Sequence, residues 1–259
     1  MGERLVSTPR PGPVALVGGG PGPLDLLTVR AERLLREADV VVADRLGPGP
    51  EALAELCWCA DVIDVGKQPG HHPVPQEQIT ALLLDHALAG RRVVRLKGGD
   101  PVVFGRGGEE YAACLAAGIP VEIVPGVTSA VAVPQAAGIP LTHRGTAASV
   151  HVVHGQGAPT AATLAALDDD TTTTVVLMGV GGLSRLVAAA LAHGVPPSRP
   201  TAIIENGHSD RQRTTRSTLG QVVEVARTVG VRSPAVIVLG EVARHGLLLS
   251  APMREDVLP

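Results

Sequence analysis

The sequence predicts an α/β protein made of two lobes with mostly parallel sheets, and three observations support this prediction. Short β-branched runs alternate with segments whose apolar residues recur at helical spacing. The runs are continuously apolar, as in strands buried on both faces of a sheet. The pattern restarts after a segment rich in proline and glycine at 138–144. We therefore expect an N-terminal α/β lobe over residues 1–142 and a C-terminal α/β lobe over residues 143–259.

The first lobe is expected to alternate strands with helices from its first apolar run onward. The run "VALVGGG" at 14–20 stops at glycines and is typical of a buried strand. In chain order, the elements expected after it are helix 25–38, strand 39–44, strand 61–67, helix 75–90, strand 91–99, helix 108–118 and strand 121–126.

The second lobe repeats the alternation with fewer helices between its strands. Four strands are expected in it, at 149–155, 173–180, 200–207 and 233–242. Helices are expected at 181–194 and 218–230. The acidic residues in "DDDTTTT" at 168–174 indicate a solvated turn before a strand.

Composition argues against a nucleic-acid-binding protein. Phe104, Trp58 and Tyr111 are the only aromatic residues, too few for stacking on bases. The formal net charge is −3, and there is no run of lysines. Nor is there an apolar run approaching the roughly 18 residues of a membrane span, or a signal-peptide core at the start. We expect a cytoplasmic, soluble protein.

The three cysteines make neither a disulfide framework nor a metal site. Cys57 and Cys59 form a CxC pair with no second cluster to complete a set of metal ligands, and Cys114 stands alone. We expect structural roles for them and no bound metal.

The loop "VGGGPGPLD" at 17–25 has the layout of a dinucleotide-binding turn without its spacing. It follows a strand, opens a helix, and Asp44 ends the next strand. The G-x-G-x-x-G pattern that starts at Gly18 needs a glycine where Pro23 stands, and Pro21 and Pro23 have no N–H to offer a pyrophosphate. The alternative interpretation is a sharp turn, in which a proline could still offer a flat apolar wall to a ligand.

The segment "LKGGDP" at 96–101 is the second candidate loop. Its two glycines let the backbone approach a ligand closely, and Asp100 follows a strand where α/β sheets bind ligands. A carboxylate there suits an amino group or a ribose hydroxyl. Alternatively, Asp100 only caps a turn. Thr128 and Ser129 follow a similar strand and could either hold a ligand or cap a helix.

Arginines beside three separate loops indicate a polyanionic substrate. They are Arg45, Arg106 and Arg144, and each could instead be an ordinary surface residue. Lys67, one of only two lysines, also lies at the end of an expected strand. From the residues alone, the protein is a two-lobed α/β enzyme with a carboxylate-lined pocket that does not bind phosphate.

Several motifs together resemble the S-adenosylmethionine-dependent tetrapyrrole methylases, of the kind that act on uroporphyrinogen III. The similarity covers about Val14 to Ala243. The motifs occur in this order: "VGGGPGPLDLLTVRAERLLREADVVVADRL", "VGK", "PQEQI", "VVRLKGGDPVVFGRGGEE", "VPGVTSAVAVPQAAGIPLTHRG", "VVLMGV" and "AIIENG" followed by "RQR".

The resemblance implies two α/β lobes with the cofactor in the cleft between them, and a homodimer. It implies methylation of uroporphyrinogen III at C2 and C7 to give precorrin-2, which feeds sirohaem, cobalamin or haem d1 synthesis. No dehydrogenase–ferrochelatase segment precedes these motifs, so the later steps to sirohaem are expected elsewhere.

The resemblance also implies roles for individual residues. Asp44 matches the proton acceptor and Lys67 the proposed proton donor, while Arg106 matches an arginine that acts on the substrate. Arg45, Arg106 and Arg144 are expected to bind substrate carboxylates. The residues expected to contact S-adenosylmethionine are Pro21, Gly98, Gly99, Asp100, Val103, Thr128, Ser129, Met178, Gly207 and Ala235.

One departure and two alternatives remain. Relatives often have "VTGH" where this chain has "VVHGQG" at 152–157, so His154 and Gln156 leave the role of that loop open. A sister methylase acting on another ring carbon is the nearest alternative activity. A noncatalytic nucleotide- or NAD-binding protein is the alternative from another class, and the broken glycine spacing at 17–25 disfavours it.

Overall fold

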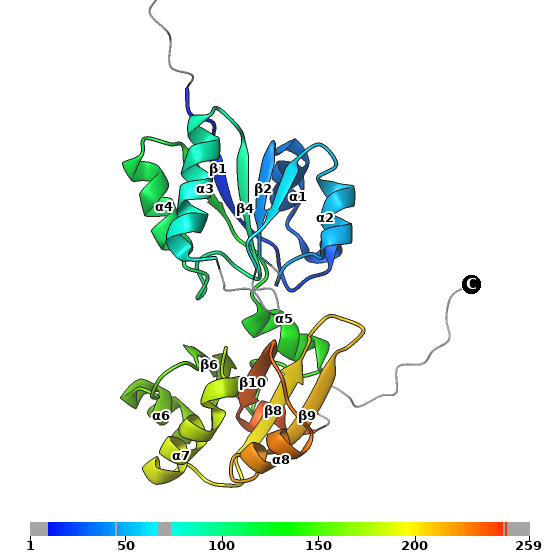
Figure 1. Ribbon diagram of the computed structural model, residues 1–259. Helices are drawn as coiled ribbons and strands as arrows, with labels where there is room; N and C mark the ends of the chain where they lie inside the picture. Colours follow the sequence, from blue (N-terminus) through cyan, green and yellow to red (C-terminus); the bar gives the residue numbers. More distant parts are fainter. Residues whose placement is uncertain (1–9, 45, 67–73, 246, 248–259) are drawn as a thin grey trace, which may run out of the picture. The chain divides into compact units, whose positions relative to one another are not determined.

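The computed structural model describes residues 10–44, 46–66, 74–245 and 247, and the chain divides into two compact units after Thr128 (Figure 1). This division lies earlier than the boundary after residue 142 that the sequence suggests. The physical reason is helix α5 (Ser129–Ala136), whose Ala130 and Val133 pack into the core of the second unit. The cluster of prolines and glycines therefore follows a helix that belongs to the second unit.

The first unit is built on a five-stranded sheet in which every neighbouring pair is parallel, in the order β3-β2-β4-β1-β5. Its elements are β1 (Val14–Gly18), a 3-10 turn (Leu24–Leu26), α1 (Val29–Glu37), β2 (Val40–Ala43), α2 (Pro50–Leu56), β3 (Asp61–Asp64), α3 (Gln76–Leu88), β4 (Val93–Lys97), α4 (Gly107–Ala116) and β5 (Val121–Val124).

Helices cover both faces of this sheet, which is why its central strands are apolar without interruption (Figure 1). On one face, Ala15 and Val17 of β1 pack with α1 and α2. On the other face, Val14 and Leu16 of the same strand pack with α3 and α4. Because successive side chains of a strand point to opposite faces, both sets of positions must be apolar.

The second unit has a mixed sheet rather than a mostly parallel one. Its strand order is β6-β7-β10-β8-β9, with only β6 and β7 parallel. After α5 its elements are β6 (Ser149–His154), α6 (Ala161–Asp168), β7 (Thr172–Leu177), a 3-10 turn (Val180–Gly182), α7 (Leu183–His193), β8 (Pro200–Glu205), β9 (Arg213–Thr218), α8 (Val222–Thr228), β10 (Ala235–Leu239) and a 3-10 turn (Glu241–Ala243).

Two apolar layers also sandwich this second sheet. Helix α5 and the last 3-10 turn pack on one face, with Val175, Ala202 and Val238 of the strands. Helices α6, α7 and α8 pack on the other face, with Val176 and Ile203. The sequence expectations of strands at β6, β7, β8 and β10 and of helices at α7 and α8 are confirmed.

Three elements escaped the sequence analysis. Strand β9 reads "RTTRST" and has no apolar run, because it is an edge strand hydrogen-bonded only to β8 and its side chains are at least partly exposed. Helices α2 and α6, of seven and eight residues, were not expected from the sequence either.

The buried cysteines serve the core of the first unit. Cys57 packs with α1 and α2, and Cys114 packs on the opposite face, whereas Cys59 is exposed. Burial raises the pKa of the Cys57 thiol to about 11. All three thiols are free. No helix in the described part of the chain has the length and apolar character that crossing a bilayer requires.

Candidate active site

The loops at the carboxyl edge of the first sheet carry most of the residues singled out in that unit. Strands β1, β2, β4 and β5 run in the same direction, so they end at one edge. Pro21 follows β1, Asp44 follows β2, and Gly98 to Asp100 follow β4. This is the edge at which open parallel sheets bind their ligands.

Glycines allow three of these loops to meet backbone against backbone. A Cβ atom added to Gly18 would lie 2.4 Å from the nitrogen of Gly126, and one added to Gly126 would lie 2.3 Å from the carbonyl oxygen of Gly99. Gly20 and Gly99 exchange two hydrogen bonds, with N···O distances of 3.2 and 2.8 Å. Both have positive φ values of 64° and 68°, which glycine adopts without strain.

Gly98 is closely packed for a similar reason. A Cβ atom there would lie 2.5 Å from the Cβ atom of Leu46, in the loop that follows Asp44. The loops after β1, β2, β4 and β5 therefore form one tightly joined ledge of backbone. No dinucleotide fingerprint is required to explain its glycines, in agreement with the broken spacing at 17–25.

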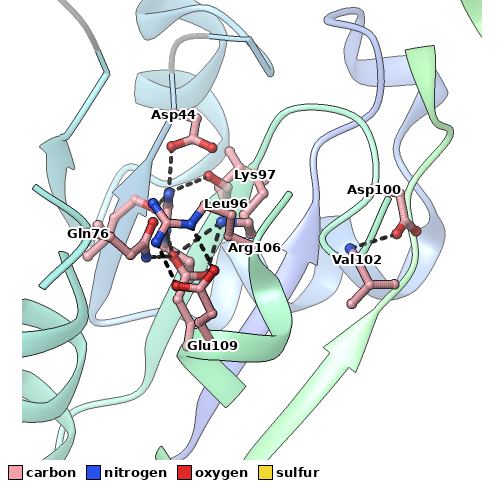
Figure 2. A network of polar contacts seen from close by, with 11 residues as sticks. Asp44, Gln76, Leu96, Lys97, Asp100, Val102, Arg106 and Glu109 are labelled. Atoms are coloured by element: carbon pink, nitrogen blue, oxygen red, sulfur yellow. Dashed lines mark hydrogen bonds and ion pairs between the residues drawn. The ribbon is translucent and has the colours of Figure 1, made fainter. Parts of the chain in front are cut away.

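Asp100 is the side chain that ties this ledge together. Its Oδ1 atom accepts a hydrogen bond from the backbone N–H of Val102 at 2.9 Å (Figure 2). The same atom accepts a second one from the N–H of Val103, at 3.2 Å. Its Oδ2 atom accepts one from the N–H of Gly126, at 3.2 Å. The carboxylate therefore caps the turn after β4, as one of the two interpretations of the sequence expected, and joins that turn to the loop after β5.

Arg106 lies at the start of α4 in an unusual backbone conformation. Its φ is 59°, and Phe104 two residues earlier has a φ of 56°, both in the left-handed region that residues other than glycine rarely adopt. The exposed Arg106 guanidinium donates to both carboxylate oxygens of Glu109, at 2.9 and 2.6 Å (Figure 2). These hydrogen bonds hold the pKa of Glu109 below its ordinary value. Backbone strain of this kind concentrates at functional sites.

Beneath the same edge lies a buried network of charged side chains that the sequence analysis missed. Glu110 of α4 is fully buried and accepts hydrogen bonds from Arg95 Nε at 3.1 Å, from Lys97 Nζ at 3.0 and 3.2 Å, and from Gln76 Nε2 at 2.8 Å. Arg95 Nη2 donates to Asp44 Oδ1 at 2.6 Å (Figure 2). The network thus extends from the core to a predicted catalytic residue.

The network balances two cations against two anions in a place where a lone charge would be costly. Burial, and then the neighbouring Arg95 charge, lower the pKa of Lys97. A signal for this network was present in the sequence. In "VVRLK", Arg95 and Lys97 stand two positions apart in an otherwise apolar strand, so their side chains leave the same face of the sheet.

A second group of the predicted residues lies at one edge of the sheet in the other unit. Strands β6, β7 and β8 run in the same direction and end at this edge, where the antiparallel β10 begins. Met178 follows β7, Gly207 lies beyond the end of β8, and Ala235 is the first residue of β10. Met178 has a φ of 53°, another non-glycine residue in the left-handed region.

A cavity of about 400 Å³ opens at this edge of the second sheet. Met178 lines it together with residues that were not assigned to the cofactor. These are Gly155, Gln156, Gly157, Gly181, Gly182, Arg185 and Ser233. A Cβ atom on Gly182 would lie 2.2 Å from the carbonyl oxygen of Gly155, so here too glycines let two loops touch. The variant loop "VVHGQG" is therefore part of the cavity wall.

Gly207 and Ala235 belong to the same edge through backbone contacts. A Cβ atom on Gly207 would lie 2.6 Å from both methyl carbons of Val133 in α5, so glycine lets the loop pack on that helix. Ala235 pairs with Glu205, and the N–H of Asn206 donates to the carbonyl oxygen of Pro234 at 3.0 Å.

The remaining predicted residues are less informative. Thr128 ends the first unit and Ser129 begins both the second unit and α5. Arg144 is exposed in the turn between α5 and β6, and Val103 is exposed beside Asp100. Arg45 and Lys67 lie outside the described residues. Among the described residues, no group of three or more histidine, cysteine, aspartate or glutamate side chains is placed to hold a metal ion.

Comparison with protein families identifies the group to which this architecture belongs. Residues 13–223 match the model of the tetrapyrrole (corrin/porphyrin) methylases, which is most of the chain. The chain belongs to this family. The two glycine-lined edges described above are thus parts of a tetrapyrrole methylase.

Two curated members of the family are 44–46% identical to this chain over the residues that align. An S-adenosyl-L-methionine-dependent uroporphyrinogen III methyltransferase from Methanosarcina barkeri is 44% identical over 92% of this chain and 94% of that protein. A siroheme synthase from Methylococcus capsulatus is 46% identical over 89% of this chain and 49% of that protein. The chain spans about half the length of the siroheme synthases that it matches.

Solved structures agree with this placement. A uroporphyrin-III C-methyl transferase from Thermus thermophilus, crystallised with S-adenosyl homocysteine, is 45% identical, with a TM-score of 0.76 over 90% of this chain and 99% of that one. A cobalt precorrin-4 methyltransferase has a similar TM-score of 0.77 but only 26% identity. The two structures resemble this chain equally in fold, but the uroporphyrin-III C-methyl transferase is much more similar to it in sequence.

Proposed function

We propose that this protein is a C-methyltransferase that uses S-adenosylmethionine to methylate uroporphyrinogen III at C2 and C7, giving precorrin-2. The observation that carries this proposal is the 44% identity to the Methanosarcina barkeri enzyme over nearly the full length of both chains. The two partial matches to siroheme synthases support the same methylation, because this chain aligns with about half of each of them.

The first unit offers a suitable ledge for the cofactor. Glycines at 18, 98 and 126 pack so closely that a side chain at any of them is excluded, which leaves backbone groups at the surface of the ledge. We propose that Pro21, Gly98, Gly99, Asp100, Val103 and Thr128 hold S-adenosylmethionine here. Asp100 acts by fixing the loops through its three backbone hydrogen bonds as well as by its charge.

The second unit offers the Met178 side chain in a cavity otherwise lined by glycines and polar residues. We propose that Ser129, Met178, Gly207 and Ala235 contribute to cofactor binding. Met178 supports this because its strained backbone directs an apolar, polarisable side chain to a cavity wall. When bound, S-adenosylmethionine supplies an electrophilic methyl group on its sulfonium and leaves as S-adenosylhomocysteine.

The chain's own residues then have to align the macrocycle and move a proton. Methylation of a pyrrole carbon requires close alignment, and a ring proton must afterwards leave. We propose that Asp44 accepts a proton and that Arg106 binds substrate carboxylates next to the reacting ring, with Arg144 as a further partner. Lys67 as proton donor and Arg45 as substrate ligand rest on their sequence motifs alone.

A sister methyltransferase acting on another ring carbon is the second candidate. The cobalt precorrin-4 methyltransferase supports it through its fold, but its 26% identity is well below the 44% of the Methanosarcina enzyme. We further propose, from the family resemblance, that the protein is a cytoplasmic homodimer. Sedimentation velocity would test the dimer, and a single species with the monomer mass would refute it.

The activity is tested by incubating the protein with uroporphyrinogen III and S-adenosylmethionine labelled with ¹³C in its methyl group. Mass spectrometry should show a product with two added methyl groups, and NMR should place them on C2 and C7. A product methylated elsewhere would favour the sister activity. No methylation, with S-adenosylhomocysteine unbound in calorimetry and NAD bound instead, would favour the nucleotide-binding alternative.

A further inference from the structure

Asp44 is held from one side by a buried arginine. Arg95 Nη2 lies 2.6 Å from Asp44 Oδ1, and Arg95 is only 2% exposed while Asp44 is about a third exposed. The other oxygen, Oδ2, makes no hydrogen bond within the described part of the chain. The contact therefore fixes one oxygen and leaves the second available for a proton.

The backbone around Asp44 is fixed by the same strand. Val42 pairs with Arg95 in the sheet, and the N–H of Asp44 donates to the carbonyl oxygen of Leu96 at 3.0 Å. Arg95 Nη1 donates to the carbonyl oxygens of Val42 and Leu96, at 3.2 and 3.0 Å. The guanidinium thus holds the end of β2 and the carboxylate of Asp44 at the same time.

Arg95 itself has little freedom to move. Its Nε atom donates to Glu110, which is held in turn by Lys97 and Gln76. Lys97 already contacts both oxygens of Glu110, so charge balance at Glu110 does not require a second cation. Burying an arginine beside a lysine is costly unless the arginine is paired with an anion of its own. Here the spare end of the guanidinium points to Asp44.

We propose that Arg95 is a positioning residue for methyl transfer, which acts by orienting Asp44 and is itself anchored by Glu110. This inference rests on the proposed function, in which Asp44 accepts a proton. Arg95 does not touch the substrate or the cofactor. It holds Oδ1 so that Oδ2 faces the reacting ring, and its planar fork can do this because it binds carboxylate and carbonyl oxygens together.

The test is a double-mutant cycle on the full chain with Arg95→Gln, Asp44→Asn and the combined variant. Asp44→Asn should lower kcat by about 100-fold or more, as is common for a lost acid–base group. Arg95→Gln should lower kcat by about tenfold or more, with KM for uroporphyrinogen III and Kd for S-adenosylhomocysteine within about twofold. The combined variant should be no slower than Asp44→Asn, because Arg95 acts only through Asp44.

Arg92→Gln is a matched control. Arg92 precedes β4 and forms an ion pair with Asp39, which precedes β2, so this pair joins the same two strands at their other ends. Its loss should leave kcat unchanged. Thermal unfolding of every variant, together with the S-adenosylhomocysteine Kd, separates a general loss of structure from a local effect. If Arg95→Gln does not fold, Arg95→Lys keeps the buried charge and should still lower kcat, since an ammonium lacks the fork.

The outcomes separate this inference from the proposed function. A wild-type protein that does not methylate uroporphyrinogen III overturns both. An active wild type with multiplicative losses in the combined variant overturns only the role of Arg95, because independent effects would then add in free energy. A change confined to KM, or a wild-type kcat in whichever of Arg95→Gln and Arg95→Lys folds, would do the same.

Discussion

Lys97 Nζ lies 3.0 Å from Glu110 Oε2, and both side chains are buried between the parallel sheet and the helices on one of its faces. Each charge in this pair depends on the other, since neither can reach water. Burial lowers the pKa of Lys97, with a further contribution from Arg95. A buried pair of this kind contributes little net stability while it is intact, but breaking it is costly.

Glu110→Gln should therefore destabilise the protein strongly. The substitution keeps the shape of the side chain but leaves Arg95 and Lys97 with too little negative charge, and such losses are of the order of 3–5 kcal/mol. Denaturant unfolding of the wild type and the variant measures the difference. The loss in free energy of unfolding should shrink as the pH rises towards 10.5, the ordinary pKa of lysine. Below that pH the unfolded state binds more protons than the native state, because the pKa of Lys97 is lowered by folding.

The matched control for this change is Glu109→Gln on the same helix. Glu109 pairs with Arg106 at the surface, where water screens the charges, so the free energy of unfolding should change little. Equal effects at the two positions would contradict a special role for the buried carboxylate.

The ion pair of Asp39 with Arg92 predicts a pH dependence of stability. Hydrogen bonds from the Arg92 side chain and backbone lower the pKa of Asp39 from 3.8 to about 2. A lowered carboxyl pKa stabilises the folded protein above the ordinary pKa of 3.8, and this contribution is lost as the pH falls through about 2. Because the pair is largely exposed, we expect a contribution below about 1 kcal/mol.

Asp39→Asn tests this expectation. At pH 7 the variant should unfold at a slightly lower urea concentration than the wild type. The two curves should approach each other as the pH falls from 4 towards 2, since Asp39 of the wild type then becomes protonated. A difference between the two proteins that stays constant over this range would show that the carboxylate charge is not the cause.

The sequence predicted the first unit well because the pattern of apolar residues within each segment was enough to identify its strands and most of its helices. Continuous apolar strands, such as Val14 to Val17, report directly that both faces of the sheet are covered. The second unit was less predictable. Strand direction is set by which neighbours pair, and nothing in "AVIVL" at 235–239 indicates that β10 runs antiparallel to β7 and β8. Strand β9 lacks the apolar signal because only its pairing with β8 places it in the sheet.

The site shows the same division between local and long-range information. The loop glycines and Asp100 were identified from their position after a strand. Their contacts were not, because Asp100 meets Gly126 and Gly18 meets Gly126 only once separate strands lie side by side. Glu110 was not singled out from the sequence, and only the packing of α4 on the sheet shows that it is buried.

Gly126→Ala should disturb the ledge of backbone at the edge of the first sheet. The new methyl group would lie 2.3 Å from the carbonyl oxygen of Gly99, so one of the two loops must move. We expect a loss of about 1–3 kcal/mol in the free energy of unfolding and weaker binding of S-adenosylhomocysteine. Gly108→Ala is the control, because nothing lies within 4 Å of a Cβ atom there. Unchanged binding in Gly126→Ala would separate the ledge from the cofactor.

Arg106→Ala should impair methyl transfer far more than cofactor binding. The exposed guanidinium is held over the start of α4 by Glu109, in a strained backbone conformation that fixes its direction. Losing one charged contact to a substrate carboxylate should lower kcat/KM by about 10- to 100-fold. The Kd of S-adenosylhomocysteine, measured by calorimetry, should stay the same. Arg227→Ala is the matched control, since Arg227 also forms a solvent-exposed ion pair with a glutamate three residues away on a helix. It should leave both quantities unchanged, and equal losses of catalysis and cofactor binding in Arg106→Ala would assign Arg106 to the cofactor instead.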